Sequence, residues 1–227
     1  MTLILGHFFV RMCYMVLAKL NSLQIIFLIL VPIFLILAIV LLIVIPVNNR
    51  HHKNNFNEYC YKAIYKIAFD EDYYLINNFV FRVDHSRVAR IDHILFANKY
   101  IYVIIDTYYD GSLVGKDEDK SLILIDKKNT KYYTDNQFLV SKSLVNSLSR
   151  STGIDKDLFI GIVVVNNSCK LGIETNEKSN YMIQRNKLKK LIKAIESRDV
   201  GNINSAQLES AVKAIDKLNR TKRKNEK

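Results

Sequence analysis

Two short apolar runs that flank a three-residue turn place the strongest constraint on how this chain can fold. Residues 91–96 and 100–106 are rich in β-branched and aromatic side chains, and Asn98 lies in the short segment between them. Such side chains favour strands and asparagine favours turns, so the pattern predicts a β-hairpin. Gly111 follows the second run, where we expect the backbone to turn.

Predicted helices and strands alternate along the chain from residue 56 onward. The run 159–165 is continuously apolar, which is typical of a strand covered on both faces. The helix expected at 137–148 should face inward with Val140, Leu144, Val145 and Leu148. Apolar spacing predicts further helices at 56–69, 185–197 and from Asn204 or Ser205 to 218, and further strands at 73–83, 87–96, 121–125 and 181–183. We therefore expect an α/β fold with a mixed central sheet flanked by helices.

The stretch 25–47 contains no charged residue and is long enough to cross a bilayer with some tilt. We predict a transmembrane helix at 23–47 and a juxtamembrane linker at 48–55. Residues 1–22 are apolar but are interrupted by Arg11 and Lys19, which favours an interfacial segment over a second span. A short second span that forms a helical hairpin remains the alternative.

Charges and cysteines around the predicted span indicate its orientation. Arg50 and Lys53 follow it directly, which favours a cytoplasmic C-terminal domain. Cys13, Cys60 and Cys169 are widely separated, so disulfides and structural zinc are not expected and a reducing compartment is favoured. We predict a single-pass protein of the cell membrane.

The C-terminal region is strongly basic. The chain has a formal net charge of +11, and the region from Met182 onward holds 13 Lys and Arg against 5 Asp and Glu. We expect a basic helical region at 186–219 and a disordered tail at 220–227. Such a region suits an anionic partner, either lipid headgroups or nucleic acid, although lysine-rich tails also serve solubility alone. The candidate contacts are Lys187, Lys190, Arg220, Lys222, Arg223 and Lys224.

Four short patterns in order resemble the NERD (nuclease-related) domain of the restriction-endonuclease-like superfamily. The hairpin begins with Ile-Asp-His at 91–93 and continues through an apolar run, a turn and Ile-Tyr-Val-Ile at 101–104 to Gly111. The segment 57–61 resembles a degraded Gly-Glu-x-x-Val helix start, Gln137 opens a later helix, and 161–165 resembles a core strand. The resemblance covers roughly residues 56–185 and implies a restriction-endonuclease-like fold.

The resemblance implies metal-dependent cleavage of nucleic acid. Such nucleases hold a divalent metal with two carboxylates, and a lysine stabilises the developing charge. Asp92 is a candidate metal ligand, but the Glu-x-Lys motif, aligned on Val103, Ile104 and Gly111, falls on Ile105 and Thr107. Alternation along the strand turns Asp106 and Asp110 away from a site that Ile105 faces. A lysine could instead reach the site from Lys99, Lys116 or Lys120.

Three further residues have both a structural and a functional interpretation. His93 should point to the opposite face from Asp92, which favours a histidine with satisfied hydrogen bonds over a catalytic one. Glu58 either complements a helix dipole or contributes to a metal site. Gln137 either caps its helix or orients a phosphate or a water. With Asp92, Glu58 and Gln137 form the predicted remnant of a catalytic site.

No Gly-x-Ser-x-Gly, P-loop or His-Glu-x-x-His motif is present, and no small-molecule substrate is evident. We expect a catalytically weakened NERD-like domain that binds nucleic acid or a protein partner at the cytoplasmic face of the lipid bilayer. In that case no cofactor is needed. One alternative is an active nuclease with relocated residues and Mg²⁺ as cofactor. The other is a purely structural or interaction membrane protein that does not bind nucleic acid, with a membrane or cytoplasmic protein as its partner.

Overall fold

The computed structural model describes the chain at residues 22–84, 86–175 and 177–219, without the side chains at 22–25, 28 and 43–52. The chain forms two compact units, residues 1–53 and residues 54–227. The predicted segment 1–22 lies almost entirely outside the described residues. The tail 220–227 lies outside them as well, together with the candidate contacts Arg220, Lys222, Arg223 and Lys224.

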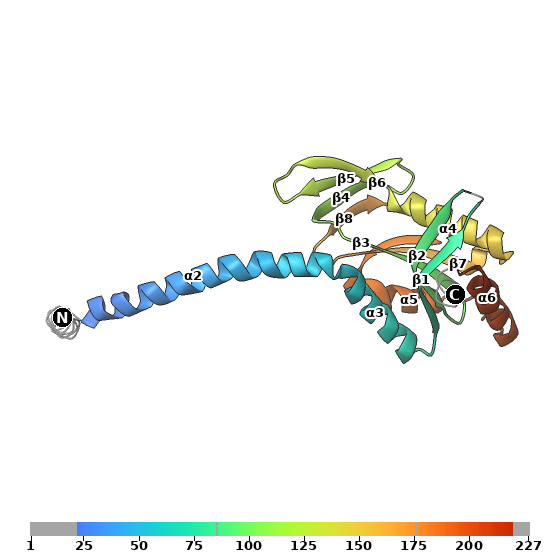
Figure 1. Ribbon diagram of the computed structural model, residues 1–227, viewed down its shortest axis with the longest axis horizontal. Helices are drawn as coiled ribbons and strands as arrows, with labels where there is room; N and C mark the ends of the chain where they lie inside the picture. The colour runs from blue at the N-terminus through green and yellow to red at the C-terminus, as the bar shows by residue number, and fades with distance from the viewer. Residues whose placement is uncertain (1–21, 85, 176, 220–227) are drawn as a thin grey trace. The chain divides into compact units, whose positions relative to one another are not determined.

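One long helix, α2 (Ser22–Asn54), accounts for the described part of the first unit (Figure 1). It extends through most of the segment predicted as a linker at 48–55. Its described side chains from Ile26 to Leu42 are all exposed. Within the part of the chain that the structure describes, no helix is both long enough and apolar enough to cross a membrane. The predicted span 25–47 includes side chains outside that part, at 25, 28 and 43–47.

The second unit is built on a mixed five-stranded sheet of order β1-β2-β3-β7-β9. The first three strands are antiparallel neighbours, and β7 and β9 continue the sheet in parallel with β3. Ile101 of β3 lies opposite Phe96 of β2, which confirms the predicted hairpin. The bounds are β1 (Tyr74–Arg82), β2 (Val88–Phe96), β3 (Ile101–Thr107), β7 (Phe159–Val165) and β9 (Asn180–Gln184).

Helices cover both faces of this sheet (Figure 1). On one face, α3 (Phe56–Asp70) and α5 (Leu188–Glu196) pack against β-strand residues such as Leu95 and Ile104. On the other, α4 (Gln137–Thr152) and α6 (Ser205–Leu218) pack against Ile94 and Val103. All seven residues of β7 are buried, as its continuous apolar run predicts. The predicted α/β architecture with flanking helices is therefore confirmed.

One detail of the predicted helix 137–148 is wrong. Val140 is exposed, whereas Phe138 and Ser141 are buried with Val145 and Leu148. These four buried residues are spaced three or four apart and form one stripe, which leaves Val140 beside it.

A second sheet packs beside the first, and the sequence predicts only one of its strands, the one at 121–125. Its order is β6-β5-β4-β8, and its strands are β4 (Gly111–Lys116), β5 (Ser121–Asp126), β6 (Lys131–Asp135) and β8 (Lys170–Glu174). Leu113 and Leu122 of this sheet share a core cluster with Val163 and Val165 of β7. Gly111 is required at its start, because a Cβ there would lie 2.1 Å from the carbonyl oxygen of Ile125.

A change of side-chain phase in β1 and β2 positions the candidate site. In β1, Ile76 faces the α4 side of the sheet. Strict alternation would next put Asn78 on that side, but Phe79 faces it instead. In β2, Ile91 and Ile94 both face that side, so Asp92 and His93 between them both point away from it. Asn78 has a left-handed backbone with φ of 52°, a conformation that asparagine tolerates well. The strict alternation assumed for β2 therefore fails at this point.

Asn136 links the second sheet to α4 and provides a test of the fold. Its side chain accepts a hydrogen bond from the Phe138 N–H and donates to three carbonyl groups of the β4–β5 turn, at Lys116, Asp117 and Asp119. Because Asn136 is buried, Asn136→Ala removes these buried hydrogen bonds and should lower the free energy of unfolding by about 2–4 kcal/mol. Urea unfolding followed by circular dichroism measures the loss.

Asn204→Ala is the matched control. Asn204 caps α6 through a capping box with Gln207, but it is exposed, so its removal should reduce stability by only about 1 kcal/mol. Equal losses for the two variants would contradict the structural role assigned to Asn136.

Candidate functional site

A polar cavity of about 430 Å³ lies between the start of α3 and the strands β1, β2 and β3. It brings together two of the three predicted remnant residues, Asp92 and Glu58. The third, Gln137, begins α4 and is not among the residues that line the cavity. The lining residues are Asn57, Glu58, Tyr61, Asn77, Asn78, Arg90, Asp92, His93 and Asp106.

Asp106 shares this cavity with Asp92, and its backbone N–H donates to Asp92 Oδ2 at 3.0 Å. The expectation that Asp106 turns away from the site is therefore wrong. Alternation does hold in β3, but it puts Ile105 on the other face. Ile105 lies opposite Val163 of β7, whose side chain belongs to the cluster shared with the second sheet.

In the comparison with the Glu-x-Lys motif, the carboxylate therefore lies one residue further along β3 than the sequence alignment places it. The carboxylate that reaches the cavity is Asp106 rather than a residue at position 105. The position two residues further on is then Tyr108, whose ring packs edge-on against Phe56 with centroids 5.7 Å apart. Counted from Asp106, the two positions of the motif thus hold a carboxylate and an aromatic residue in this chain.

His93 is buried and hydrogen-bonded through both ring nitrogens. Its Nδ1 lies 2.6 Å from Asn77 Oδ1, and its Nε2 lies 2.9 Å from Asp106 Oδ2. The expectation of a satisfied histidine is confirmed, but the expectation that it faces away from Asp92 is wrong, because both line one cavity. If Nδ1 donates to the amide oxygen of Asn77, Nε2 is the ring nitrogen that forms the hydrogen bond with Oδ2 of Asp106.

Burial dominates the electrostatics of Asp106. It raises the pKa of this carboxyl group, and the hydrogen bond from His93 opposes the rise only in part. Oδ1 of Asp106 is buried without a hydrogen bond from the described residues. Burial, and next the charge of Asp106, also raise the pKa of the Cys60 thiol, which is therefore held in its protonated, unreactive form.

The three carboxylates around the cavity each have a basic partner from the protein itself. Glu58 lies 2.6 Å from Lys62 Nζ, Asp92 lies 3.6 Å from Arg90 Nε, and Asp106 is bonded to His93. Among the residues that the structure describes, no group of three or more His, Cys, Asp or Glu side chains is arranged to hold a metal ion. Each carboxylate is therefore directed at a basic side chain of the protein, whereas the two-carboxylate metal site that the family resemblance implies needs carboxylate oxygens available to the ion.

The lysine alternatives do not supply the missing residue. No lysine lines the cavity within the described part of the chain. Lys99 Nζ donates to the carbonyl of Arg198, and Lys116 lies near Glu174 of β8. Lys187 and Lys190, the described members of the basic C-terminal set, are exposed at the start of α5, away from the residues that line this cavity.

Sequence reasoning missed two residues here for different reasons. The cap of α4 is Asn136 rather than Gln137, a choice for which asparagine directly before an apolar helix is the recognisable signal. Arg90 reaches both Asp92 and Asn78 Oδ1, at 2.9 Å for the latter, but only the phase change at Asn78 brings these groups together.

The raised pKa of Asp106 predicts a specific pH dependence of stability. Above the ordinary aspartate pKa of about 3.9, the unfolded chain has lost this proton while the folded chain keeps it, so the unfolding free energy falls as pH rises through the folded pKa. Asp106→Asn removes this fall and preserves a side chain that can donate to His93. The unfolding free energy of the variant should therefore rise relative to that of the wild type as pH rises. Urea unfolding as a function of pH measures this difference.

Asp84→Asn is the control of opposite sign. The hydrogen bond from Arg87, followed by the N–H groups of Ser86 and Arg87, holds the pKa of Asp84 below its usual range. The unfolding free energy of the wild type should therefore rise relative to that of Asp84→Asn as pH rises from the acidic range. Parallel curves for the wild type and Asp106→Asn would contradict the assignment of Asp106.

Comparison with known protein families supports the resemblance seen in the sequence. The family model described as the nuclease-related domain (NERD) matches residues 53–166, which is half of the chain. The match includes α3, β1 to β6, α4 and β7, and thus every residue that lines the cavity. No match was found among curated proteins or among solved structures. The chain belongs to the NERD, or nuclease-related domain, family.

Proposed function

We propose that this chain is a NERD domain that binds nucleic acid without cleaving it. The observation that carries the proposal is the pairing of each cavity carboxylate with a protein base, namely Glu58 with Lys62, Asp92 with Arg90 and Asp106 with His93. Metal-dependent cleavage needs carboxylate oxygens that are free to bind the ion. In this chain a basic side chain lies beside each of these carboxylates and would compete with an ion for its oxygens.

The replacement of the motif lysine supports the loss of cleavage. Tyr108 occupies the position two residues after Asp106, and its ring is engaged with Phe56. A phenol cannot supply the positive charge that a lysine offers to a developing oxyanion. Arg90 is the nearest cation, but it already interacts with Asp92 and Asn78.

Nucleic-acid binding is supported by charge and by exposed aromatic side chains. The chain has a formal net charge of +11, which favours a polyanionic partner. Tyr61, Tyr65 and Phe69 follow one another along α3 at four-residue spacing and are 39%, 52% and 77% exposed. Adjacent ring centroids in this row are 5.9 and 6.4 Å apart. A row of exposed rings that begins at a polar cavity suits the stacking of unpaired bases.

Cleavage is the second candidate, and one observation favours it. The N–H of Asp106 lies 3.0 Å from Asp92 Oδ2, so two carboxylates stand at the same cavity. If a metal ion displaced Arg90 and His93 from these carboxylates, the pair could bind it. The two candidates therefore differ in whether Mg²⁺ or Mn²⁺ binds measurably and is followed by cleavage.

The first test uses the full-length chain with fluorescently labelled single-stranded DNA, double-stranded DNA and RNA. We expect binding that weakens as salt concentration rises, with no cleavage in Mg²⁺ or Mn²⁺. Asp92→Ala should bind at least as well as the wild type, because it removes a negative charge. Fluorescence anisotropy measures binding, and gel electrophoresis detects cleavage.

Asp110→Ala is the matched control, since Asp110 is an exposed carboxylate paired with Lys127 outside the cavity. Saturable Mn²⁺ binding by calorimetry, with cleavage that is lost in Asp92→Ala and retained in Asp110→Ala, would establish the nuclease instead. The absence of any nucleic-acid binding would contradict both candidates and would favour a module with a protein partner.

We also propose that residues 23–47 anchor the chain in the cell membrane, with the NERD domain on the cytoplasmic side. The support is the uncharged stretch 25–47, the basic residues Arg50 and Lys53 after it, and the exposure of its described apolar side chains. The bilayer would then be a partner of the first unit.

Ile36→Arg tests the anchor. An arginine near the middle of a span opposes insertion by about 2.5–3.5 kcal/mol, so less protein should remain in the membrane pellet after alkaline extraction. Ile36→Leu is the control and should remain in the pellet like the wild type. If the wild type itself is extracted at high pH, the anchor is wrong.

A further inference from the structure

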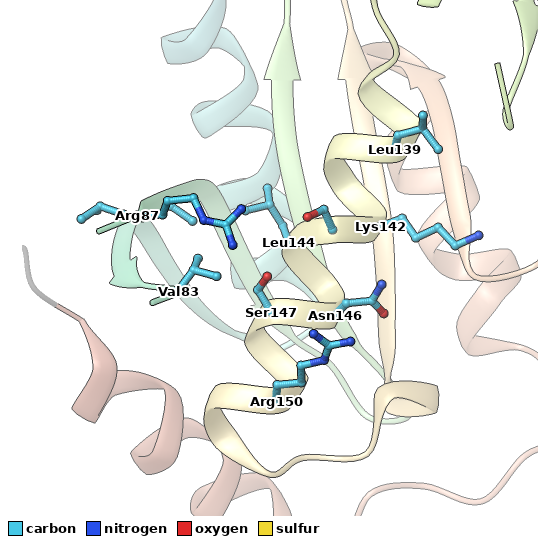
Figure 2. Close-up of a pocket in the computed structure, with 11 residues that line it drawn as sticks. Val83, Arg87, Leu139, Lys142, Leu144, Asn146, Ser147 and Arg150 are labelled. Atoms are coloured by element: carbon cyan, nitrogen blue, oxygen red, sulfur yellow. The ribbon is translucent and has the colours of Figure 1, made fainter. Parts of the chain in front are cut away.

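A second cavity, of about 500 Å³, lies between α4 and the end of the hairpin formed by β1 and β2 (Figure 2). It shares no lining residue with the candidate site. Its apolar floor includes Val83, Val88 and Leu144, and its other lining residues are three basic and three neutral polar side chains. No carboxylate lines it within the described part of the chain. A cavity of this composition favours an anionic ligand.

The polar side chains come from one face of α4. Ser143, Ser147 and Arg150 are spaced three or four residues apart, with Asn146 next to them, so the helix presents them together. Figure 2 shows Arg87 extending from the hairpin toward α4 and Arg150 extending along the helix toward Asn146 and Ser147. The two guanidinium groups thus approach the same polar patch from different elements.

The three basic residues differ in their availability. Lys142 is paired with Glu177, and in Figure 2 its side chain points away from the two arginines. Arg87 uses Nε to bind Asp84 Oδ2 at 2.6 Å, which fixes the side chain at its base. Arg150 is exposed, and among the described residues it forms no ion pair. Arg150 therefore carries the uncompensated positive charge of this cavity.

We propose that this cavity binds one nucleotide unit of a nucleic-acid strand, with a backbone phosphate held between Arg87 and Arg150. Guanidinium groups match the geometry of phosphate oxygens, and Asn146 and Ser147 offer further donors. The volume exceeds what a phosphate alone requires and lies in the usual range of small-ligand sites, about 300–1,000 Å³. The sugar would then lie over the apolar floor. The inference rests on the proposed function, because it locates a contact for the nucleic acid.

The test compares two variants that remove the same charge from the same cavity. Arg150→Gln should weaken the binding of a labelled oligonucleotide to the full-length chain about tenfold and should reduce the salt slope of binding by about one phosphate contact. Lys142→Gln should change affinity less than about twofold, because Lys142 is already paired and points elsewhere. Arg87→Gln, on the other element, should also weaken binding, but less than Arg150→Gln, because Arg87 is paired with Asp84 through Nε.

Arg150→Lys tests the geometry separately from the charge. It should retain the salt slope but recover only part of the affinity, since an ammonium group lacks the planar fork. Thermal unfolding of all variants checks that they fold, which we expect because Arg87 and Arg150 are both exposed. Equal losses in Arg150→Gln and Lys142→Gln, or no loss in either, would overturn the site.

Competition identifies the source of the phosphate. A nucleoside monophosphate should displace the oligonucleotide from the wild type at lower concentration than inorganic phosphate does, and the difference should vanish in Arg150→Gln. Displacement only by phosphatidylglycerol vesicles would indicate a lipid headgroup and would overturn the inference. A wild type that binds no nucleic acid would refute the proposed function itself, whereas binding that is indifferent to Arg87 and Arg150 would refute this inference alone.

Discussion

The buried hydrogen bond between His93 Nε2 and Asp106 Oδ2 is the interaction on which the candidate site depends. It joins β2 to β3 where their backbone pairing ends. His93 and Ile104 are the last paired residues, and Asp106 lies two residues further along β3. A buried carboxylate without a partner would be strongly unfavourable, and His93 supplies that partner while Asn77 fixes its ring. The same bond occupies Oδ2 of Asp106, whereas Oδ1 has no hydrogen bond from the described residues.

The β-hairpin of β1 and β2, here called the ribbon, lines both cavities. Its middle lines the polar cavity beside α3, through Asn77, Asn78, Arg90, Asp92 and His93. Its end lines the basic cavity beside α4, through Val83, Arg87, Val88 and Ala89. The two cavities differ in charge character, because one contains carboxylates with paired bases and the other contains arginines without a lining carboxylate. The proposed nucleic-acid contact and the proposed loss of cleavage thus concern two different cavities.

Sequence reasoning predicted the first sheet and its helices because their signals are local. Helical spacing in α3, the continuous apolar run of β7 and the Asn204 capping box of α6 need no knowledge of distant residues. Most of the second sheet escaped prediction for the opposite reason. The strand β6 exposes most of its residues, and β4 contains two glycines, so neither has the alternating apolar pattern that marks a strand. Only pairing with β5 and β8 makes them strands.

Neighbouring residues are enough to predict the family, the order of the main elements, the hairpin and the presence of Asp92 at a site-like position. Tertiary structure alone decided which carboxylate joins Asp92. The second sheet covers the face of Ile105, and the left-handed Asn78 changes the side-chain phase of the ribbon so that Asp92 and His93 share a cavity with Asp106. Alternation is a local rule, and it fails where contacts distant in sequence bend the strand.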